Sequence, residues 1–154
     1  PLSENTNGLH IGVAAFDYKS LYPSMMVARN ISWETKSTEP TEFKINIKTP
    51  KDFSEISEHE IVYFKTDKLG LLPKAVLELQ ELRNSYKVKM KDALDKEEYN
   101  KWNSNQMAVK RLMASFYGVL AYQGFSWADV DLAASITASA REAIREAAFI
   151  VRNL

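Results

Sequence analysis

The strongest constraint on the fold of this chain is a long stretch with helical periodicity between residues 70 and 118. At 100° per residue, apolar residues in its first half fall in one narrow stripe, and basic residues run along the flank. The stripe consists of Ala75, Leu79, Leu82, Tyr86, Met90 and Ala93, and the flank of Arg83, Lys87 and Lys91. Gly70 and Pro73 mark the start of this predicted helix.

A second helix is predicted after a break that we place at residues 95–98. Its apolar seam is expected to contain Trp102, Val109, Leu112 and Phe116, with Lys110, Ala114 and Tyr117 beside it. Gly118 is expected to end the helix, because a Tyr-Gly pair is a common C-cap. Two helices joined by so short a turn should pack antiparallel. Their basic edge, taken alone, is typical of a solvated helix face.

The flanking segments indicate strands and shorter helices. The mostly apolar run 9–16, closed by Asp17, predicts a buried strand. Residues 20–30 predict a turn and a short helix, and residues 32–66 a small antiparallel strand pair. A last amphipathic helix over 131–152 is expected to cover a sheet with one apolar face. That face consists of Ile136, Ala140, Ala143, Ala147 and Ile150.

The composition limits which metal sites and partners the chain can have. With 154 residues, 45% of them hydrophobic, the chain can bury one core. It has no Cys and two His, so we expect any metal to be held by oxygen. Twenty basic and twenty acidic residues leave the net charge at zero, so only the distribution of charge can indicate an anionic partner. No apolar run approaches the length of a membrane span, and we expect no membrane partner. The chain opens with Pro instead of Met, which suggests a piece of a larger protein.

Two strings carry a specific resemblance. Residues 17–24 read Asp-Tyr-Lys-Ser-Leu-Tyr-Pro-Ser, and residues 110–118 read Lys-Arg-Leu-Met-Ala-Ser-Phe-Tyr-Gly. The first resembles motif A of family B DNA polymerases of the archaeal type, D-x-x-S-L-Y-P-S, and the second resembles their motif B, K-x-x-x-N-S-x-Y-G. Leu-Pro at 72–73, followed by Arg83 and Lys87, is similar to the L-P…R-x-x-x-K pattern of the same family. Order and spacing agree from about residue 9 to the end.

This resemblance implies an α+β fold with a partial palm sheet, covering helices and an antiparallel two-helix fingers hairpin. Residues 1–69 would form the N-terminal part of the palm with motif A and a small β insert. Residues 70–118 would form the fingers with motif B, and residues 119–154 a palm return segment and helix.

The resemblance also implies a reaction, the transfer of a nucleotide to a primer 3′-hydroxyl with two Mg²⁺ ions. Asp17 would be the catalytic carboxylate and a metal ligand, and the backbone carbonyl of Tyr18 a second metal contact. Without the resemblance, an Asp that follows a strand is more often the cap of the next helix.

The implied dNTP site draws on three segments. The backbone amides of Ser20 and Leu21 would hold the triphosphate at a helix start, and Tyr22 would exclude a 2′-hydroxyl as a steric gate. Without the resemblance, Tyr22 and Pro23 would be an ordinary turn. The other implied substrate-binding residues are Arg83, Lys87 and Lys110, facing the triphosphate, and Tyr117 and Gly118, under the nascent base pair.

One position departs from the family pattern, because Ala114 stands where motif B usually has Asn. An amide-to-phosphate hydrogen bond contributes about 1.5–3 kcal/mol, so its loss should weaken triphosphate binding without abolishing it. The carboxylates of the family's motif C are also not matched. One matched carboxylate cannot hold two metals, so we expect this chain to be inactive alone, as an excised fragment or as one subunit of a split enzyme.

The implied partners are a DNA primer-template, dNTP and the remaining polymerase domains or split subunit, with self-association through unpaired strand edges. The expected location is the cytoplasm at the nucleoid in a prokaryote, or the nucleus in a eukaryote. The alternative is an inactivated paralogue whose helical pair binds protein or nucleic acid, which Ala114 favours slightly. A third hypothesis is an unrelated α+β interaction protein with accidental motifs.

Overall fold

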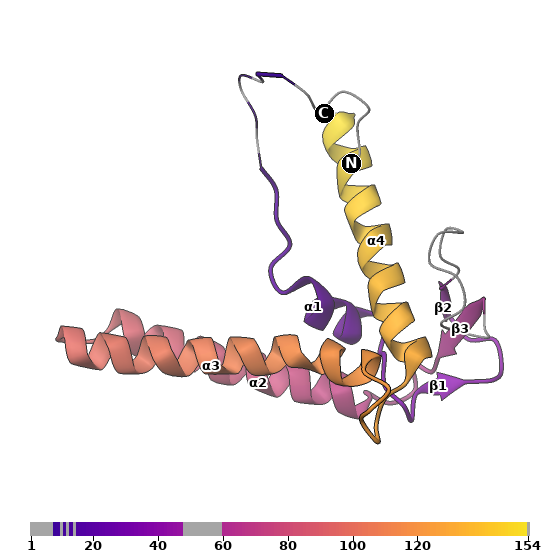
Figure 1. Ribbon diagram of the computed structural model, residues 1–154, viewed down its shortest axis with the longest axis horizontal. Helices are drawn as coiled ribbons and strands as arrows, with labels where there is room; N and C mark the ends of the chain where they lie inside the picture. Colours follow the sequence, from indigo (N-terminus) through magenta and orange to yellow (C-terminus); the bar gives the residue numbers. More distant parts are fainter. Residues whose placement is uncertain (1–7, 10, 12, 14, 48–59, 154) are drawn as a thin grey trace.

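The computed structural model describes residues 8, 9, 11, 13, 15–47 and 60–153, and these form four helices and one three-stranded antiparallel sheet. The α+β expectation is confirmed. In Figure 1, helices α2 and α3 lie side by side and project as an arm from a base formed by α1, the sheet and the start of α4, while the rest of α4 extends in another direction. In chain order the elements are α1 (Leu21–Ala28), β1 (Lys36–Ser37), β2 (Phe43–Asn46), β3 (Ile61–Phe64), α2 (Leu71–Lys91), α3 (Lys96–Ala121) and α4 (Val130–Arg152).

The sheet has the order β1-β3-β2, and both neighbours of β3 run antiparallel to it. Ile45 pairs with Val62 in the register of β2 and β3, and Phe43 pairs with Phe64. Ile45, Val62 and Phe64 are buried, as the alternation of apolar and polar residues predicts. The strand pair predicted within 32–66 is therefore confirmed, with the two-residue strand β1 as an addition.

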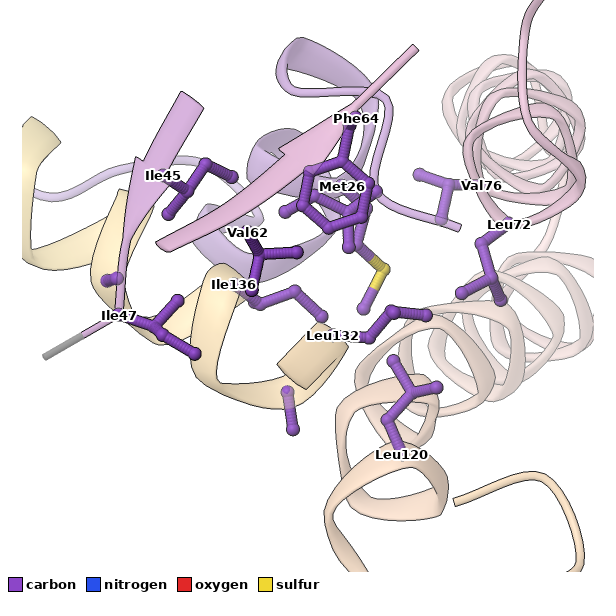
Figure 2. Packing of buried hydrophobic residues seen from close by; sticks show 13 residues of the cluster. Met26, Ile45, Ile47, Val62, Phe64, Leu72, Val76, Leu120, Leu132 and Ile136 are labelled. Atoms are coloured by element: carbon purple, nitrogen blue, oxygen red, sulfur yellow. The ribbon is translucent and has the colours of Figure 1, made fainter. Parts of the chain in front are cut away.

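The core joins the sheet to all four helices. Figure 2 shows Met26 of α1, Phe64 of β3, Val76 of α2 and Leu132 of α4 pointing into one apolar cluster, which Leu120 of α3 closes from below. Each of these side chains is at most 1% exposed. Complete burial of such a side chain contributes about 1.5–3 kcal/mol, so this cluster holds the base together.

The antiparallel helix pair is confirmed, with two corrections at its turns. The break lies at residues 92–95 instead of 95–98, because the Asp95 side chain caps α3 by accepting from the Glu98 N–H at 2.8 Å. Gly118 does not end α3, which continues to Ala121. A glycine typically ends a helix by adopting a positive φ, and Gly118 does not do so.

The predicted seam of α3 is wrong at one position. Leu112 is half exposed, whereas its neighbour Met113 is buried. Near the base α3 packs against α1 and α4 as well as α2. At 100° per residue, Met113 lies within about 40° of the buried Gln106, Val109 and Leu120, whereas Leu112 lies at least about 60° from each of them, so the helical period itself places Met113 in the seam.

The strand predicted at 9–16 is also wrong for the residues that the structure describes. None of residues 9, 11, 13, 15 and 16 is in a strand, and their large apolar side chains are exposed. Residues 10, 12 and 14 lie outside the described part. A strand needs a hydrogen-bonded neighbour, and within the described part of the chain β1, β2 and β3 pair only with one another.

Helix α4 matches the predicted range 131–152 to within one residue. It contacts β2, α1 and α3, and Ile136 and Ala140 on its predicted face are buried. Farther along the same face, Ile150 is half exposed. The expected cover over the sheet is thus provided by the first half of the helix. None of the described helices is both long enough and apolar enough to cross a membrane.

Candidate functional site

A small pocket lies where the start of α1 meets α2. Its volume is about 120 Å³, and its lining consists of two cationic and four neutral polar side chains. These are Lys19, Ser20, Ser24, Gln80, Arg83 and Asn84. None of the described residues that line it is a carboxylate, so the pocket suits an anion.

The backbone at this pocket is arranged around a left-handed residue. Ser20 has φ 55° and is the N-cap of α1, and its carbonyl accepts the Ser24 N–H at 2.9 Å. The amides of the N-cap Ser20 and of Leu21 and Tyr22, in the first turn, have no acceptor within the helix. Pro23, the third residue of α1, has no N–H. The helix start therefore offers three N–H groups and the positive end of its dipole.

Cations from both arm helices lie close enough to Lys87 to act on it electrostatically. The pKa of Lys87 is lowered, first by burial and then by the repulsion of Arg83, Lys19, Lys91 and Lys110. The charges of Lys19, on the segment before α1, and of Lys110, on α3, therefore both act on Lys87 of α2. A bound anion would relieve this repulsion.

The direction of Arg83 is set by a buried amide. Its Nε donates to Oε1 of Gln106 at 3.1 Å, and Nε2 of Gln106 donates to Oδ1 of Asn103 at 2.9 Å. Gln106 is buried although it is polar. This chain of hydrogen bonds holds the guanidinium of α2 against α3.

An aromatic pair joins the two strings that carry the resemblance. The rings of Tyr22 and Tyr117 lie 4.9 Å apart and are tilted by 48°. Gly118 follows directly, and a Cβ added there would meet nothing within 4 Å. The space beside Gly118, the residue after Tyr117, is therefore open.

Asp17 and Tyr18 lie on another side of α1. Together with Phe16 they line a groove of about 490 Å³ against the second half of α4. The Tyr18 hydroxyl donates to the carbonyl of Ala143 at 2.9 Å, which attaches this segment to α4. Asp17 is exposed and does not line the pocket of Arg83.

The fit of these residues to Mg²⁺ is partial. Asp17 offers a hard carboxylate oxygen, the ligand type that Mg²⁺ takes together with substrate phosphates. Among the described residues, no group of three Asp, Glu, His or Cys side chains could enclose a metal.

The structure thus gathers most of the predicted site residues at the junction of α1 with the arm and leaves Asp17 and Tyr18 beside α4. The gathered residues are Ser20, Leu21, Tyr22, Arg83, Lys87, Lys110, Tyr117 and Gly118. Their roles stay predictions.

Sequence reasoning missed Lys19, Gln80, Asn84 and Gln106. A signal existed for two of them, because Lys19 lies inside the first string and Gln106 lies one helical turn before Lys110.

Relatives of known family match the chain along most of its length. DNA polymerase 1 of Pyrococcus abyssi is 30% identical over 143 residues, which make up 93% of this chain and 17% of that protein. The DNA polymerase of Thermococcus sp. (strain 9oN-7) is 31% identical over 153 residues, 99% of this chain and 18% of that protein. The chain therefore spans less than a fifth of the length of these relatives.

A solved structure agrees with the sequence relatives. The family B DNA polymerase from the hyperthermophilic archaeon Pyrobaculum calidifontis superposes with a TM-score of 0.68 at 26% identity, over 88% of this chain and 17% of that one. The model of the family described as DNA polymerase family B matches residues 4–154. The chain belongs to DNA polymerase family B.

Proposed function

We propose that this chain is the dNTP-binding portion of a template-directed DNA polymerase. The observation that carries the proposal is the pocket shared by Ser20 and Arg83, whose cations Lys19 and Arg83, together with Lys110, lie close enough to lower the pKa of Lys87. A triphosphate carries the negative charge that would neutralise these cations. In this assignment residues 70–118 are the fingers, and residues 1–69 and 119–154 belong to the palm.

Each part of the junction has a role in this proposal. The amides at Ser20 and Leu21 receive the phosphates at the start of α1, and Arg83, Lys87 and Lys110 neutralise them from the arm. Tyr22, supported by the ring of Tyr117, lies against the sugar and leaves no room for a 2′-hydroxyl. The open space at Gly118 admits the nascent base pair.

Asp17 and the Tyr18 carbonyl would hold Mg²⁺, which in such enzymes activates the primer 3′-oxygen and neutralises the pyrophosphate. These two groups present a single carboxylate, so we expect the chain alone not to extend a primer. The complete enzyme would act on a DNA primer-template, with the arm as a mobile lid over the correct nucleotide.

The test is dATP binding to the chain, measured by calorimetry without DNA. We expect Arg83→Ala and Lys110→Ala each to weaken dATP binding about tenfold or more, because each removes a charge-assisted contact. The matched control is Lys96→Ala, at the far end of the arm, which should leave the affinity unchanged. Equal loss in the control would show binding by general charge only.

Tyr22→Ala addresses the sugar. We expect it to reduce the preference for dATP over ATP without removing triphosphate binding, because the phosphate contacts remain. If the ratio of the two affinities stays constant, the ring of Tyr22 does not act as a steric gate.

A second function, a binding module without catalysis, is favoured by Ala114. This residue is exposed on α3, one turn after Lys110, where an amide would reach toward the same anion. Ala114→Asn in the full-length protein separates the two functions. Turnover of dNTP in either form supports the polymerase, and no turnover in both supports the binding module.

A further inference from the structure

The loop at residues 30–35, here called the clamp loop, caps a helix that begins 36 residues after the loop ends. The N–H groups of three consecutive residues at the start of α2 donate to its side chains. Gly70 donates to Oδ1 of Asn30 at 2.8 Å, Leu71 to Oε1 of Glu34, and Leu72 to Oγ of Ser32 at 3.2 Å. The next residue is Pro73, which has no N–H. The clamp loop thus satisfies the donors that a helix start leaves free.

Asn30 also binds the segment that leads into α2. Its Nδ2 donates to the carbonyls of Lys65 and Lys68, both at 2.7 Å. Asn30 is buried and has φ 51°, a left-handed conformation that Asn tolerates better than most residues. One side chain therefore uses both donors and its acceptor to connect the end of α1 with the start of α2.

The two segments approach so closely that only glycine fits at residue 70. A Cβ added to Gly70 would lie 2.6 Å from the Cβ of Ser32, which is fully buried. The hydroxyl of Thr35 donates to the carbonyl of Asn30 at 2.6 Å, which braces the loop internally. Because the two segments pack so closely, this contact fixes the distance between the clamp loop and α2.

Glu34 contributes a charge to the contact. Its pKa is lowered, because burial raises it but hydrogen bonds from the Ser32 hydroxyl and the backbone amides of Glu34 and Leu71 outweigh that effect. The Ser32 Oγ lies 2.6 Å from Oε2 of Glu34. An ionised carboxylate at a helix N-terminus is favourable because the helix dipole is positive there.

We propose that Asn30, Ser32 and Glu34 are positioning residues that fix the direction in which α2 leaves the end of α1. Arg83 lies about 18 Å along α2 from Leu71, at 1.5 Å per residue, so a tilt of about 10° at the base would move it by about 3 Å. A displacement of that size exceeds the tolerance of a hydrogen bond. The consequence for nucleotide binding rests on the proposed function, whereas the fixed direction of α2 does not.

Spin labels can measure this direction, because the chain contains no Cys. Labels at Ala28→Cys and Val88→Cys, both exposed, report the distance between the end of α1 and the outer part of α2. We expect Glu34→Ala combined with Ser32→Ala to shift or broaden this distance by about 3 Å or more. The single variant Glu34→Ala, at an exposed residue, keeps the test informative if the double variant does not fold.

The conservative variant is Glu34→Gln, which keeps an acceptor for the Leu71 N–H and should retain the wild-type distance. The matched control is Glu78→Ala, at an exposed acidic residue of α2 outside the clamp. We expect dATP binding to weaken about three- to tenfold in Glu34→Ala and to recover in Glu34→Gln.

The outcomes separate the two proposals. An unchanged distance with a lower melting temperature overturns the positioning role, because the contacts would then be ordinary caps. A shifted distance with weaker dATP binding supports it. A shifted distance in a chain whose wild type binds no dATP supports the clamp and overturns the proposed function.

Discussion

The base and the outer arm are built by different kinds of contact. In the base, side chains from four helices and the sheet share one core, and a loop caps a helix that is distant in sequence. We call the part of α2 after Val76, with the part of α3 that packs against it, the outer arm. No described residue of α2 in the outer arm is buried. There the rings of Tyr86 and Trp102 stack at 5.8 Å, with Lys89 and Lys101 over the Trp102 ring.

This difference shows where rigidity and mobility can reside. Regions with few buried apolar contacts open at a low free energy, whereas a shared core opens only with the whole fold. The candidate site lies at the boundary, with Ser20 at the base and Arg83 on the arm. Small movements of the arm would therefore change the site without disturbing the core.

The largest expected effect comes from truncating the core. Phe64→Ala should lower the free energy of unfolding by about 3–5 kcal/mol, because Phe64 is fully buried. Leu94→Ala, at a residue 95% exposed in the turn of the arm, should change it by less than about 0.5 kcal/mol. Urea denaturation followed by tryptophan fluorescence measures both. Similar losses would remove the contrast between base and arm.

A pH titration examines the ion cluster of the base. Lys36 Nζ lies 2.6 Å from Oδ2 of Asp131 and 3.3 Å from Oδ2 of Asp129. Burial lowers the pKa of Lys36, but the two carboxylates outweigh burial and raise it above 10.5. The stabilisation is therefore complete below pH 10.5 and is lost as the pH rises above that value.

Melting temperatures between pH 8 and 11.5 measure this loss. We expect a steeper alkaline decrease for the wild type than for Lys36→Met, whereas the exposed Lys65→Met should follow the wild type. The effect should be smaller than that of the core truncation, because 32% of the Lys36 side chain remains exposed. Parallel curves for all three proteins would contradict the assignment.

At the boundary between base and arm, Gln106→Leu tests whether the hydrogen bond from Arg83 to Gln106 orients the Arg83 side chain. The variant removes the acceptor of the Arg83 Nε, so dATP binding should weaken about three- to tenfold. The melting temperature should not fall, because Leu fills a similar buried volume. Asn100→Leu, at an exposed residue of the outer arm, is the control. A parallel loss of affinity and stability would show that Gln106 acts only in packing.

Within the arm, Asp95→Ala removes the cap of α3 and should cost about 1 kcal/mol. Hydrogen exchange should become faster in the first turn of α3 and remain slow in β3. Faster exchange in both places would mean that the arm and the base unfold as one unit.

The smallest expected effect is at the surface pair of Arg29 and Glu142, which joins α1 to α4 at 3.0 Å. Both side chains are exposed, so a double-mutant cycle with Arg29→Ala and Glu142→Ala should give at most about 1 kcal/mol. A larger coupling energy would make this pair a structural element of the base.

Prediction from the sequence was most accurate for the helices, whose hydrogen bonds join residues close together in the chain. The ranges of the arm helices and of α4 follow from the 3.6-residue period and differ from the structure by a few residues at their ends. It worked least well at residues 9–16, because a short apolar run carries no information about which strand would pair with it. At Leu112 the predicted seam departs from the period, because the stripe through Gln106, Val109 and Leu120 passes through Met113 instead.

The sequence by itself determined the helical arm with its basic edge, the amphipathic last helix and the two strings that resemble the family motifs. Only the tertiary structure placed Ser20 beside Arg83, Tyr22 beside Tyr117 and the clamp loop on the start of α2. The reason is physical. Helical periodicity is a property of residues three or four apart, whereas the pocket and the clamp join segments about 40 or more residues apart, which only the packing of the base brings together.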